Sequence, residues 1–513
     1  MENYKQNFEN KGSSTIDKES QMEKISRRSF IKAASWGTLS LSFCGCNDSM
    51  RQRANGTSAK PNIIFIMTDD MGYGDASCYN PNSRIRTPNI DKLAAEGIRF
   101  TDAHSPSAVC TPTRYGVLTG RYCWRSRLKR GVFGGFNRPL IETGRMTVAS
   151  FLKQHGYHTA CIGKWHLGMD WTLKEGIKPG EQDQETVDYS QPIVNGPNEV
   201  GFDYFFGTAG CTTDDPPLCF IENHRTVGIP DEILPHDFAG ENRELRMVPG
   251  WRHEDADFEL MNKTLTFIEK ATKRKVPFFV YLPLSVPHIP WLPHEDFKGK
   301  SGAGPRGDQV LMADEILGQI NRKLSELKIA DNTLVIFTSD NGPRRGVNGH
   351  ESAGKLRGYK GGIWEGGHRV PFIAKWPKRI KPQSTSNEII GLMDLMATCA
   401  AIVGGKLPDH AGEDSFNFLP ALTGAKYNKP IRETIIHHSG GGVFSIRQDH
   451  WKLIDECRKA GYDDGPTPGA PGQLYNLAED PSEQHNLWDE HLDIVERLTH
   501  KLNQCRDQDI LDL

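Results

Sequence analysis

Short apolar runs alternate with helical segments along most of this chain, and this alternation restricts the fold more than any other feature. Each run is short and continuous, which is typical of a strand buried on both faces of a parallel sheet. The predicted strands are 62–67, 158–162, 277–282 and 333–338, and the predicted helices are 87–97, 147–154, 257–272 and 308–327. This pattern predicts an α/β fold in which helices cover both faces of a mostly parallel sheet.

The composition is that of a large folded protein. The chain has 513 residues, 37% of them hydrophobic, which suffices for one large domain with an appendage or for several domains. A net charge of −3 excludes a globally basic nucleic-acid binder, so we expect no nucleic-acid partner. No apolar run is long enough to span a membrane. Among the eleven cysteines, Cys211 and Cys219 flank a proline-rich loop and are the first pair to test for a disulfide.

The N-terminal segment has the features of an export signal. The sequence S-R-R-S-F-I-K at 26–32 precedes a short apolar stretch, 33–43, and resembles a twin-arginine signal. F-C-G-C at 43–46 resembles a degenerate lipoprotein box with Cys46 as the acylated residue. We therefore predict a signal peptide over 1–45, read by the twin-arginine export machinery, and a polar tether over 46–60. The expected location is the periplasm or cell surface, with membrane contact only through a lipid on Cys46. The alternative is a basic patch on an N-terminal helix.

Polar residues follow all four predicted strands of the sheet. Asp69-Asp70 follows the first strand, Lys164 and His166 follow the second, His288 the third and Asp340-Asn341 the fourth. Each of these segments alone is an ordinary turn sequence. Ligands in such sheets bind outside the carboxyl ends of the strands, so the coincidence of all four predicts a functional site at that edge.

The segment C-T-P-T-R at 110–114, followed by T-G-R at 119–121, resembles the C-x-P-[ST]-R signature of the type I sulfatases. The D-D, G-K-W-H-L-G and D-N-G segments match the same family in order, and the resemblance extends from about 62 to 487. It implies an alkaline-phosphatase-like fold: a large, mostly parallel sheet sandwiched by helices, and a smaller C-terminal α+β domain with an antiparallel sheet. We expect a catalytic domain over 61–403 and the C-terminal domain over 404–513. The predicted C-terminal strands are 431–436, 442–447 and 451–454, with a closing helix over 487–504.

The resemblance also implies the chemistry. In the family, a formylglycine-generating or anaerobic sulfatase-maturating enzyme oxidises the cysteine at the position of Cys110 to formylglycine (3-oxoalanine), which hydrates to a diol. One hydroxyl attacks sulfur and displaces the alcohol; the other then loses its proton, the aldehyde reforms and sulfate leaves. One metal ion would be held by Asp69, Asp70, Asp340, Asn341 and residue 110. These hard oxygen ligands suit calcium better than magnesium.

The remaining catalytic roles carry over by position. Arg114, one helical turn beyond residue 110, would reach the diol and the metal-binding carboxylates. Lys164 would bind sulfate and the diol, and His166 would take the proton in the elimination step. His288 would bind the bridging oxygen of the substrate and protonate the leaving alcohol. Asp340 would also act as the base for the attacking hydroxyl.

A further lysine is expected about twenty residues after Asp340 in the family. Lys360, in K-G-G-I-W-E-G-G, has the family context and would bind substrate together with Lys164 and His288; nearby Lys355 lacks that context. The predicted function is therefore sulfate-ester hydrolysis on a sulfated carbohydrate, with export favouring polysaccharide-derived fragments. One alternative is a phosphatase or phosphonate monoester hydrolase on the same fold. The other is a non-catalytic lipoprotein that binds sulfated glycans.

Two further segments have open interpretations. The cationic stretch after Arg121 contains Arg125, Arg127, Lys129 and Arg130. These residues could form an anionic subsite with Trp124 stacked on a sugar, or they could be a solvated or internally paired loop. His437 and His438, before S-G-G-G, could contact substrate or lie in a solvated loop.

Overall fold

A computed structural model describes residues 60–234, 244–456 and 471–507 of the chain. The predicted signal peptide, the acylation site Cys46 and all but the last residue of the predicted tether lie outside these residues. Within the described ranges, no helix is long and apolar enough to cross a membrane.

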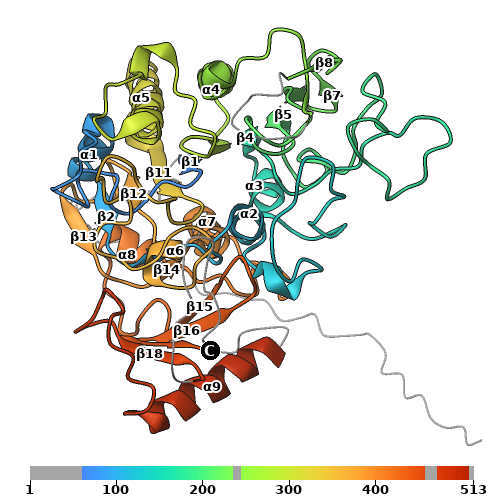
Figure 1. The fold of residues 1–513 in the computed structure, drawn as a ribbon. Helices are drawn as coiled ribbons and strands as arrows, with labels where there is room; N and C mark the ends of the chain where they lie inside the picture. Colours follow the sequence, from blue (N-terminus) through green and yellow to red (C-terminus); the bar gives the residue numbers. More distant parts are fainter. Residues whose placement is uncertain (1–59, 235–243, 457–470, 508–513) are drawn as a thin grey trace, which may run out of the picture. The chain divides into compact units, whose positions relative to one another are not determined.

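The largest element is a ten-stranded sheet with the order β13-β2-β12-β11-β1-β10-β4-β5-β6-β7 (Figure 1). Its five central strands are parallel: β11 (Thr333–Ser339), β1 (Asn62–Thr68), β10 (Phe278–Pro283), β4 (His158–Lys164) and β5 (Tyr204–Thr208). The outer strands are β13 (Ser384–Ser386), β2 (Ile98–Phe100), β12 (Phe372–Lys375), β6 (Ile221–Glu222) and β7 (Arg225–Thr226). The pairs β11–β12, β12–β2, β5–β6 and β6–β7 are antiparallel, so the sheet is parallel at its centre and mixed at its edges.

Alternate residues of the central strands pack against different helices, which makes the two faces of the sheet two separate cores. Ile63 and Phe65 of β1 belong to the core that α2, α3 and α7 cover, whereas Ile64 and Ile66 face α1, α4 and α5. The first set of helices is α2 (Cys110–Thr119), α3 (Val148–Gln154) and α7 (Leu395–Val403). The second is α1 (Pro88–Ala95), α4 (Ala256–Arg274) and α5 (Gly304–Glu326). This is the predicted sandwich of a sheet between two helical layers.

A second, antiparallel sheet is built from the last part of the described chain (Figure 1, orange to red). Its strands are β15 (Thr434–His438), β16 (Phe444–Gln448), β17 (Trp451–Ile454) and β18 (Gln473–Asn476), in that order. Helix α9 (Leu492–Asp507) packs on it through Val495, Leu498 and Leu502. The predicted antiparallel C-terminal sheet with a closing helix is therefore present.

The remaining elements are short. They are β3 (Ala103–His104), β14 (Ile390–Gly391), β8 (Glu232–Ile233), β9 (Arg246–Met247), α6 (Glu365–His368) and α8 (Leu419–Thr423). Single 3-10 turns are η1 (Cys123–Arg125), η3 (His253–Asp255), η4 (Glu295–Phe297), η5 (Ala330–Asn332) and η6 (Leu392–Asp394).

The structure answers two questions that the sequence left open. Cys211 and Cys219 are both free thiols, because Cys211 faces Lys164 rather than Cys219. His437 and His438 do not precede a solvated loop: β15 continues through both, and both are buried. Their burial also removes the predicted contact with substrate.

Candidate active site

The carboxyl ends of neighbouring parallel strands bring the predicted acidic residues together. The register pairs Thr68 of β1 with Ser339 of β11, so Asp69 and Asp70 leave the sheet beside Asp340 and Asn341. The backbone N–H of Asp70 donates to Asp340 Oδ1 at 3.2 Å. All four side chains are buried. The short distance between the two strand ends follows directly from their parallel pairing.

Helix α2 directs Cys110 and Arg114 at this acidic cluster. Every residue of α2 is buried, and Gly120 ends the helix in the left-handed conformation at φ 65°. Cys110 Sγ lies 3.5 Å from Asp69 Oδ1. Arg114, one turn later, donates to Asp69 Oδ2 at 3.0 Å and to Asp340 Oδ2 at 2.8 Å. The T-P-T-R segment thus forms the first turn of the helix, with its arginine between the two carboxylates.

Two lysines complete the charge balance of the cluster. Lys164 Nζ lies 2.5 Å from Asp69 Oδ2, and Lys360 Nζ lies 2.8 Å from Asp70 Oδ1. Lys355 is exposed and does not reach the cluster. The buried carboxylates Asp69, Asp70 and Asp340 are therefore matched by the cations Arg114, Lys164 and Lys360. A divalent cation added to this balanced set leaves a net positive charge that an anionic substrate would offset.

The electrostatics differ sharply between the carboxylates. Burial alone would raise the pKa of Asp69, but Lys164, His288 and Arg114 together hold it well below its usual value. Burial, with the charge of Asp69 next to it, raises the pKa of Asp340 to about 7. The carboxyl of Asp340 thus takes up a proton more readily than that of Asp69.

The donor set fits a hard divalent cation. Asn341 Nδ2 donates to Asp70 Oδ1 at 2.7 Å, whereas Asn341 Oδ1 is buried without a hydrogen-bond partner. A buried amide oxygen with no partner is costly unless a ligand uses it. Together with three carboxylates, this oxygen makes the all-oxygen set that calcium or magnesium prefers. Cys110 Sγ and a ring nitrogen of His288 lie within 4.8 Å of carboxylate oxygens of Asp69 and Asp70.

Two histidines are oriented by backbone carbonyls. The Nε2–H of His166 donates to the carbonyl of Phe133 at 2.5 Å, which leaves Nδ1 as the unprotonated nitrogen, buried and without a partner. Burial and the charge of Lys164 lower the pKa of His166 to about 3. The Nδ1–H of His288 donates to the carbonyl of Ile289 at 2.6 Å, and its Nε2 lies 4.0 Å from Asp70 Oδ2. Each ring therefore presents one lone pair to the site.

The structure also brings in residues that the sequence analysis missed. Cys211 Sγ lies 2.8 Å from Lys164 Nζ and 3.8 Å from His288 Nε2. Asp215 Oδ2 lies 3.4 Å from His166 Nε2. Both follow β5, whose apolar run Y-F-F-G-T is the signal that could have identified a further strand ending at this edge.

The basic segment after Arg121 is partly paired within the protein and partly exposed. Arg125 pairs with the buried carboxylate of Asp414 at 3.0 Å. Trp124 is 8% exposed and packs between Tyr122 and Phe444, so it cannot stack on a sugar. Lys129 donates to the carbonyl of Trp124 at 2.8 Å. Arg127 and Arg130 are exposed.

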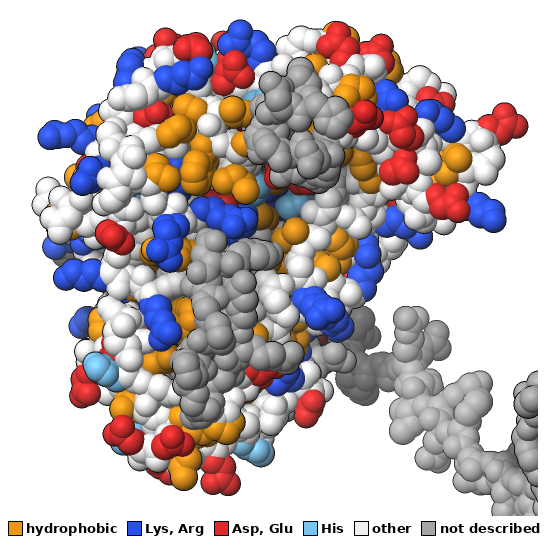
Figure 2. Space-filling model, in the orientation of Figure 1, with side chains coloured by type: hydrophobic (Ala, Val, Ile, Leu, Met, Phe, Trp, Pro, Cys, Tyr) orange, Lys and Arg blue, Asp and Glu red, His pale blue; other side chains and the backbone are white. Residues whose placement is uncertain are grey.

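Figure 2 shows cationic side chains around a recess in which acidic and histidine side chains are visible. A cluster of buried carboxylates, cations and histidines from four strand ends and one helix N-terminus is typical of a site for an anionic ester.

Comparisons with known proteins agree with this geometry. The family model described as Sulfatase matches residues 61–405, which is more than half of the chain. The chain belongs to the sulfatase family. A second family model, described as the C-terminal part of N-sulphoglucosamine sulphohydrolase, matches 359–508 of this sulfatase.

Individual proteins similar to the chain are also sulfatases. An N-acetylgalactosamine-6-O-sulfatase of Bacteroides thetaiotaomicron is 34% identical, over 90% of this chain and 96% of its own. Human arylsulfatase A is 32% identical over 83% of each chain. A solved sulfatase from work on glycosaminoglycan metabolism by B. thetaiotaomicron superposes with a TM-score of 0.77 at 33% identity, covering 88% of this chain and 100% of that one. A phosphonate monoester hydrolase of Agrobacterium radiobacter shares the fold alone, at 18% identity and a TM-score of 0.58.

Proposed function

We propose that this sulfatase removes sulfate from a sulfated carbohydrate, with a nucleophile derived from Cys110 and one calcium ion. The observation that carries the proposal is the position of Cys110 at the first turn of α2, 3.5 Å from Asp69 and surrounded by three carboxylates and three cations. Burial holds the pKa of the Cys110 thiol far above its usual value, so the unmodified thiol is a poor nucleophile here. Oxidation of Cys110 to formylglycine by a maturation enzyme would supply an oxygen nucleophile instead.

Asp69, Asp70, Asp340 and the unpartnered Oδ1 of Asn341 would hold the metal ion, next to residue 110. A bound calcium ion would polarise the sulfate and offset its charge. Calcium is favoured over magnesium because the set offers three carboxylates and an amide oxygen, whereas magnesium is usually held by one or two carboxylates and keeps several waters.

The protein's own groups would bind and orient the sulfate. Lys164 and Lys360, now paired with Asp69 and Asp70, would each contribute an ammonium to a sulfate oxygen. Arg114 would fix the orientation of Asp69 and Asp340 through its two ion pairs. In this arrangement, Asp340 would take the proton from the attacking hydroxyl at residue 110.

The two histidines would move protons at the remaining atoms. The Nδ1–H of His288 is held by the carbonyl of Ile289, so a proton taken up at Nε2 would bind the bridging oxygen and pass to the leaving alcohol, which returns the ring to its neutral form. His166 is held in the same way by Phe133, and its unpartnered Nδ1 would accept the proton released in the elimination of sulfate.

The names of the relatives support a carbohydrate substrate. The 34% identical relative is an N-acetylgalactosamine-6-O-sulfatase. The predicted twin-arginine signal supports action outside the cytoplasm on polysaccharide fragments. Two statements stay predictions. One is the division into a catalytic domain over 61–403 and a C-terminal domain over 404–513, and the other is the lipid on Cys46.

A panel of matched esters tests the proposal against the alternatives. We expect sulfate release, measured by ion chromatography, from 4-nitrophenyl sulfate and from N-acetylgalactosamine 6-sulfate. The rate on 4-nitrophenyl phosphate and phenyl phosphonate should be lower by at least tenfold. A higher kcat/KM on either phosphorus ester would favour the phosphonate or phosphate hydrolase. Binding of sulfated glycans without any release would favour the lipoprotein that only binds.

A further inference from the structure

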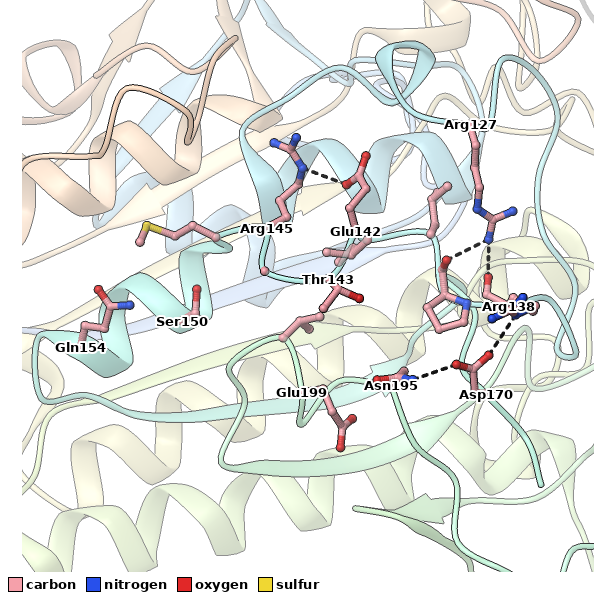
Figure 3. A pocket seen from close by; sticks show the side chains of 16 residues that line it. Arg127, Arg138, Glu142, Thr143, Arg145, Ser150, Gln154, Asp170, Asn195 and Glu199 are labelled. Atoms are coloured by element: carbon pink, nitrogen blue, oxygen red, sulfur yellow. Dashed lines mark hydrogen bonds and ion pairs between the residues drawn. The ribbon is translucent and has the colours of Figure 1, made fainter.

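A cavity of about 760 Å³ lies beside α3. Figure 3 shows its walls: Ser150 and Gln154 from α3, the loop from Arg138 to Arg145, and the segment with Asn195 and Glu199. Its volume is within the usual range for sites that bind small molecules. The chemistry described above uses none of its lining residues.

A second cavity, of about 410 Å³, adjoins the first and includes Asp215, a residue in contact with His166. It shares Arg127 and Arg138 with the first cavity, so the two meet along these side chains. At its other end it reaches Asp215, which lies 3.4 Å from His166 Nε2. Gly134 also lines it, directly after the carbonyl of Phe133 that holds His166. The two cavities thus share two side chains, and the smaller one includes a residue in contact with the proposed catalytic histidine.

The acidic residues of the larger cavity are already engaged. Glu142 accepts from Arg145 at 2.8 Å, and Asp170 accepts from Arg138 at 3.3 Å and from Asn195 at 2.8 Å (Figure 3). Glu199 accepts from the backbone N–H of Gly196 at 2.8 Å. These groups can still accept hydrogen bonds from hydroxyls, but they do not make the cavity strongly anionic.

Arg127 differs from the other cations of these cavities. Its guanidinium donates to the backbone carbonyls of Arg138 and Pro139 at 2.6 and 2.9 Å and lies 4.9 Å from the centre of the Phe133 ring. Within the part of the chain that the structure describes, it has no carboxylate partner. Its positive charge is thus fixed in place, exposed and uncompensated, where the two cavities meet.

We propose that the two cavities form one groove for the sugars next to the one that loses its sulfate, and that Arg127 binds an anionic group, sulfate or carboxylate, on a neighbouring sugar. This inference rests on the proposed function and deepens it: the preferred substrate is a charged oligosaccharide rather than a monosaccharide. Amide, hydroxyl and paired carboxylate groups such as Asn195, Thr143 and Glu142 are suited to sugar hydroxyls. Of the four cations after Arg121, Arg127 lines both cavities, and Arg138 lines them from the next loop.

The test compares two probes with the same reacting sugar: N-acetylgalactosamine 6-sulfate and a chondroitin 6-sulfate tetrasaccharide, which adds neighbouring carboxylates. We expect the wild-type kcat/KM to be higher on the tetrasaccharide. Arg127→Gln should lower the ratio of the two kcat/KM values about tenfold, because a charge-assisted hydrogen bond is lost, and less so at high salt. In Arg127→Lys, the ratio of the two kcat/KM values should lie between those of the wild type and Arg127→Gln. Arg322→Gln, which removes an exposed arginine paired with Glu315 on α5, is the matched control and should leave the ratio unchanged.

Arg138→Gln gives a second variant that should fold normally, because that side chain is 62% exposed. It should lower the same ratio. The inference is overturned if the ratio stays at its wild-type value in both Arg127→Gln and Arg138→Gln, or if the wild type hydrolyses the tetrasaccharide no better than the monosaccharide. Absence of sulfate release from every sulfate ester would instead overturn the proposed function, so the two failures are distinguishable.

Discussion

At the scale of single residues, the position of Lys360 separates a functional lysine from a neighbour of the same type. Lys360 Nζ lies 2.8 Å from Asp70, whereas Lys355 is exposed five positions earlier in the same segment. We expect Lys360→Ala to lower kcat/KM on an aryl sulfate by about a hundredfold or more, since a buried cation that would bind the sulfate is lost. Lys355→Ala is the matched control. Equal activities of the two variants would show that Lys360 does not take part in binding the sulfate.

Asp340 has two proposed roles that a conservative change can separate. Asp340→Asn keeps an oxygen near the metal position and the contact with Asp70 N–H, but it loses the charge that pairs with Arg114. We expect kcat to fall about a hundredfold or more even at saturating calcium, because the base is lost as well as a ligand. The measurement is kcat across a calcium titration. Full rescue by calcium would show that Asp340 acts only as a ligand.

At the scale of elements, a buried network joins the antiparallel sheet to the segment that carries Lys360. Lys452 of β17 contacts Glu365 of α6 at 3.0 Å and Glu483 at 2.8 Å, and it donates to His368 Nε2 at 3.0 Å. His437 of β15 stacks on His368, with ring centres 3.7 Å apart. Strands β15 and β17 thus support α6, which begins five residues after Lys360.

This network predicts a pH dependence of stability. Burial lowers the pKa values of His104, His368 and His437 below the usual value of 6.5. Below pH 6.5 the unfolded chain takes up protons that these folded rings do not, so stability is full above that pH and falls as the pH decreases. Each such histidine contributes up to about 1.4 kcal/mol per pH unit.

His437→Asn should therefore make the decrease in stability between pH 6.5 and pH 5 shallower. Asparagine can keep the hydrogen bond that His437 makes with Ser445, so the fold should be retained. The measurement is the urea concentration at half-unfolding across this pH range. His500→Asn, at an exposed position of α9, is the control, and equal changes of slope in both variants would contradict the account.

The sequence allowed the prediction of those elements whose signals are local. The apolar runs of β1, β4, β10 and β11 are continuous, and the polar residues that follow them became the candidate site. The partner of Arg125 is Asp414, 289 positions away, so no local pattern distinguished a buried ion pair from an anionic subsite. β15 extends two residues beyond its predicted end, and its two histidines are buried by contacts with distant segments.

At the scale of the whole molecule, the proposed metal ion would link the ends of two central strands. Chelation should remove the metal ion and leave the neighbouring carboxylates of Asp69, Asp70 and Asp340, at the ends of β1 and β11, without its positive charge. Because a ligand that binds only the folded state stabilises it by about 2.7 kcal/mol at a hundredfold excess over its Kd, calcium should raise Tm by a few degrees over chelated protein. Magnesium should raise it less. An identical Tm with calcium and with chelator would contradict a calcium site here.

The central claim is that Cys110 is the precursor of the nucleophile. The most direct test is the mass of the tryptic peptide 100–114, taken from enzyme whose sulfatase activity has been measured in the same sample. Conversion of the thiol to the aldehyde predicts a peptide lighter by about 18 Da than the thiol form, in proportion to the activity. Fully active enzyme that contains only the unmodified Cys110 peptide would contradict the account.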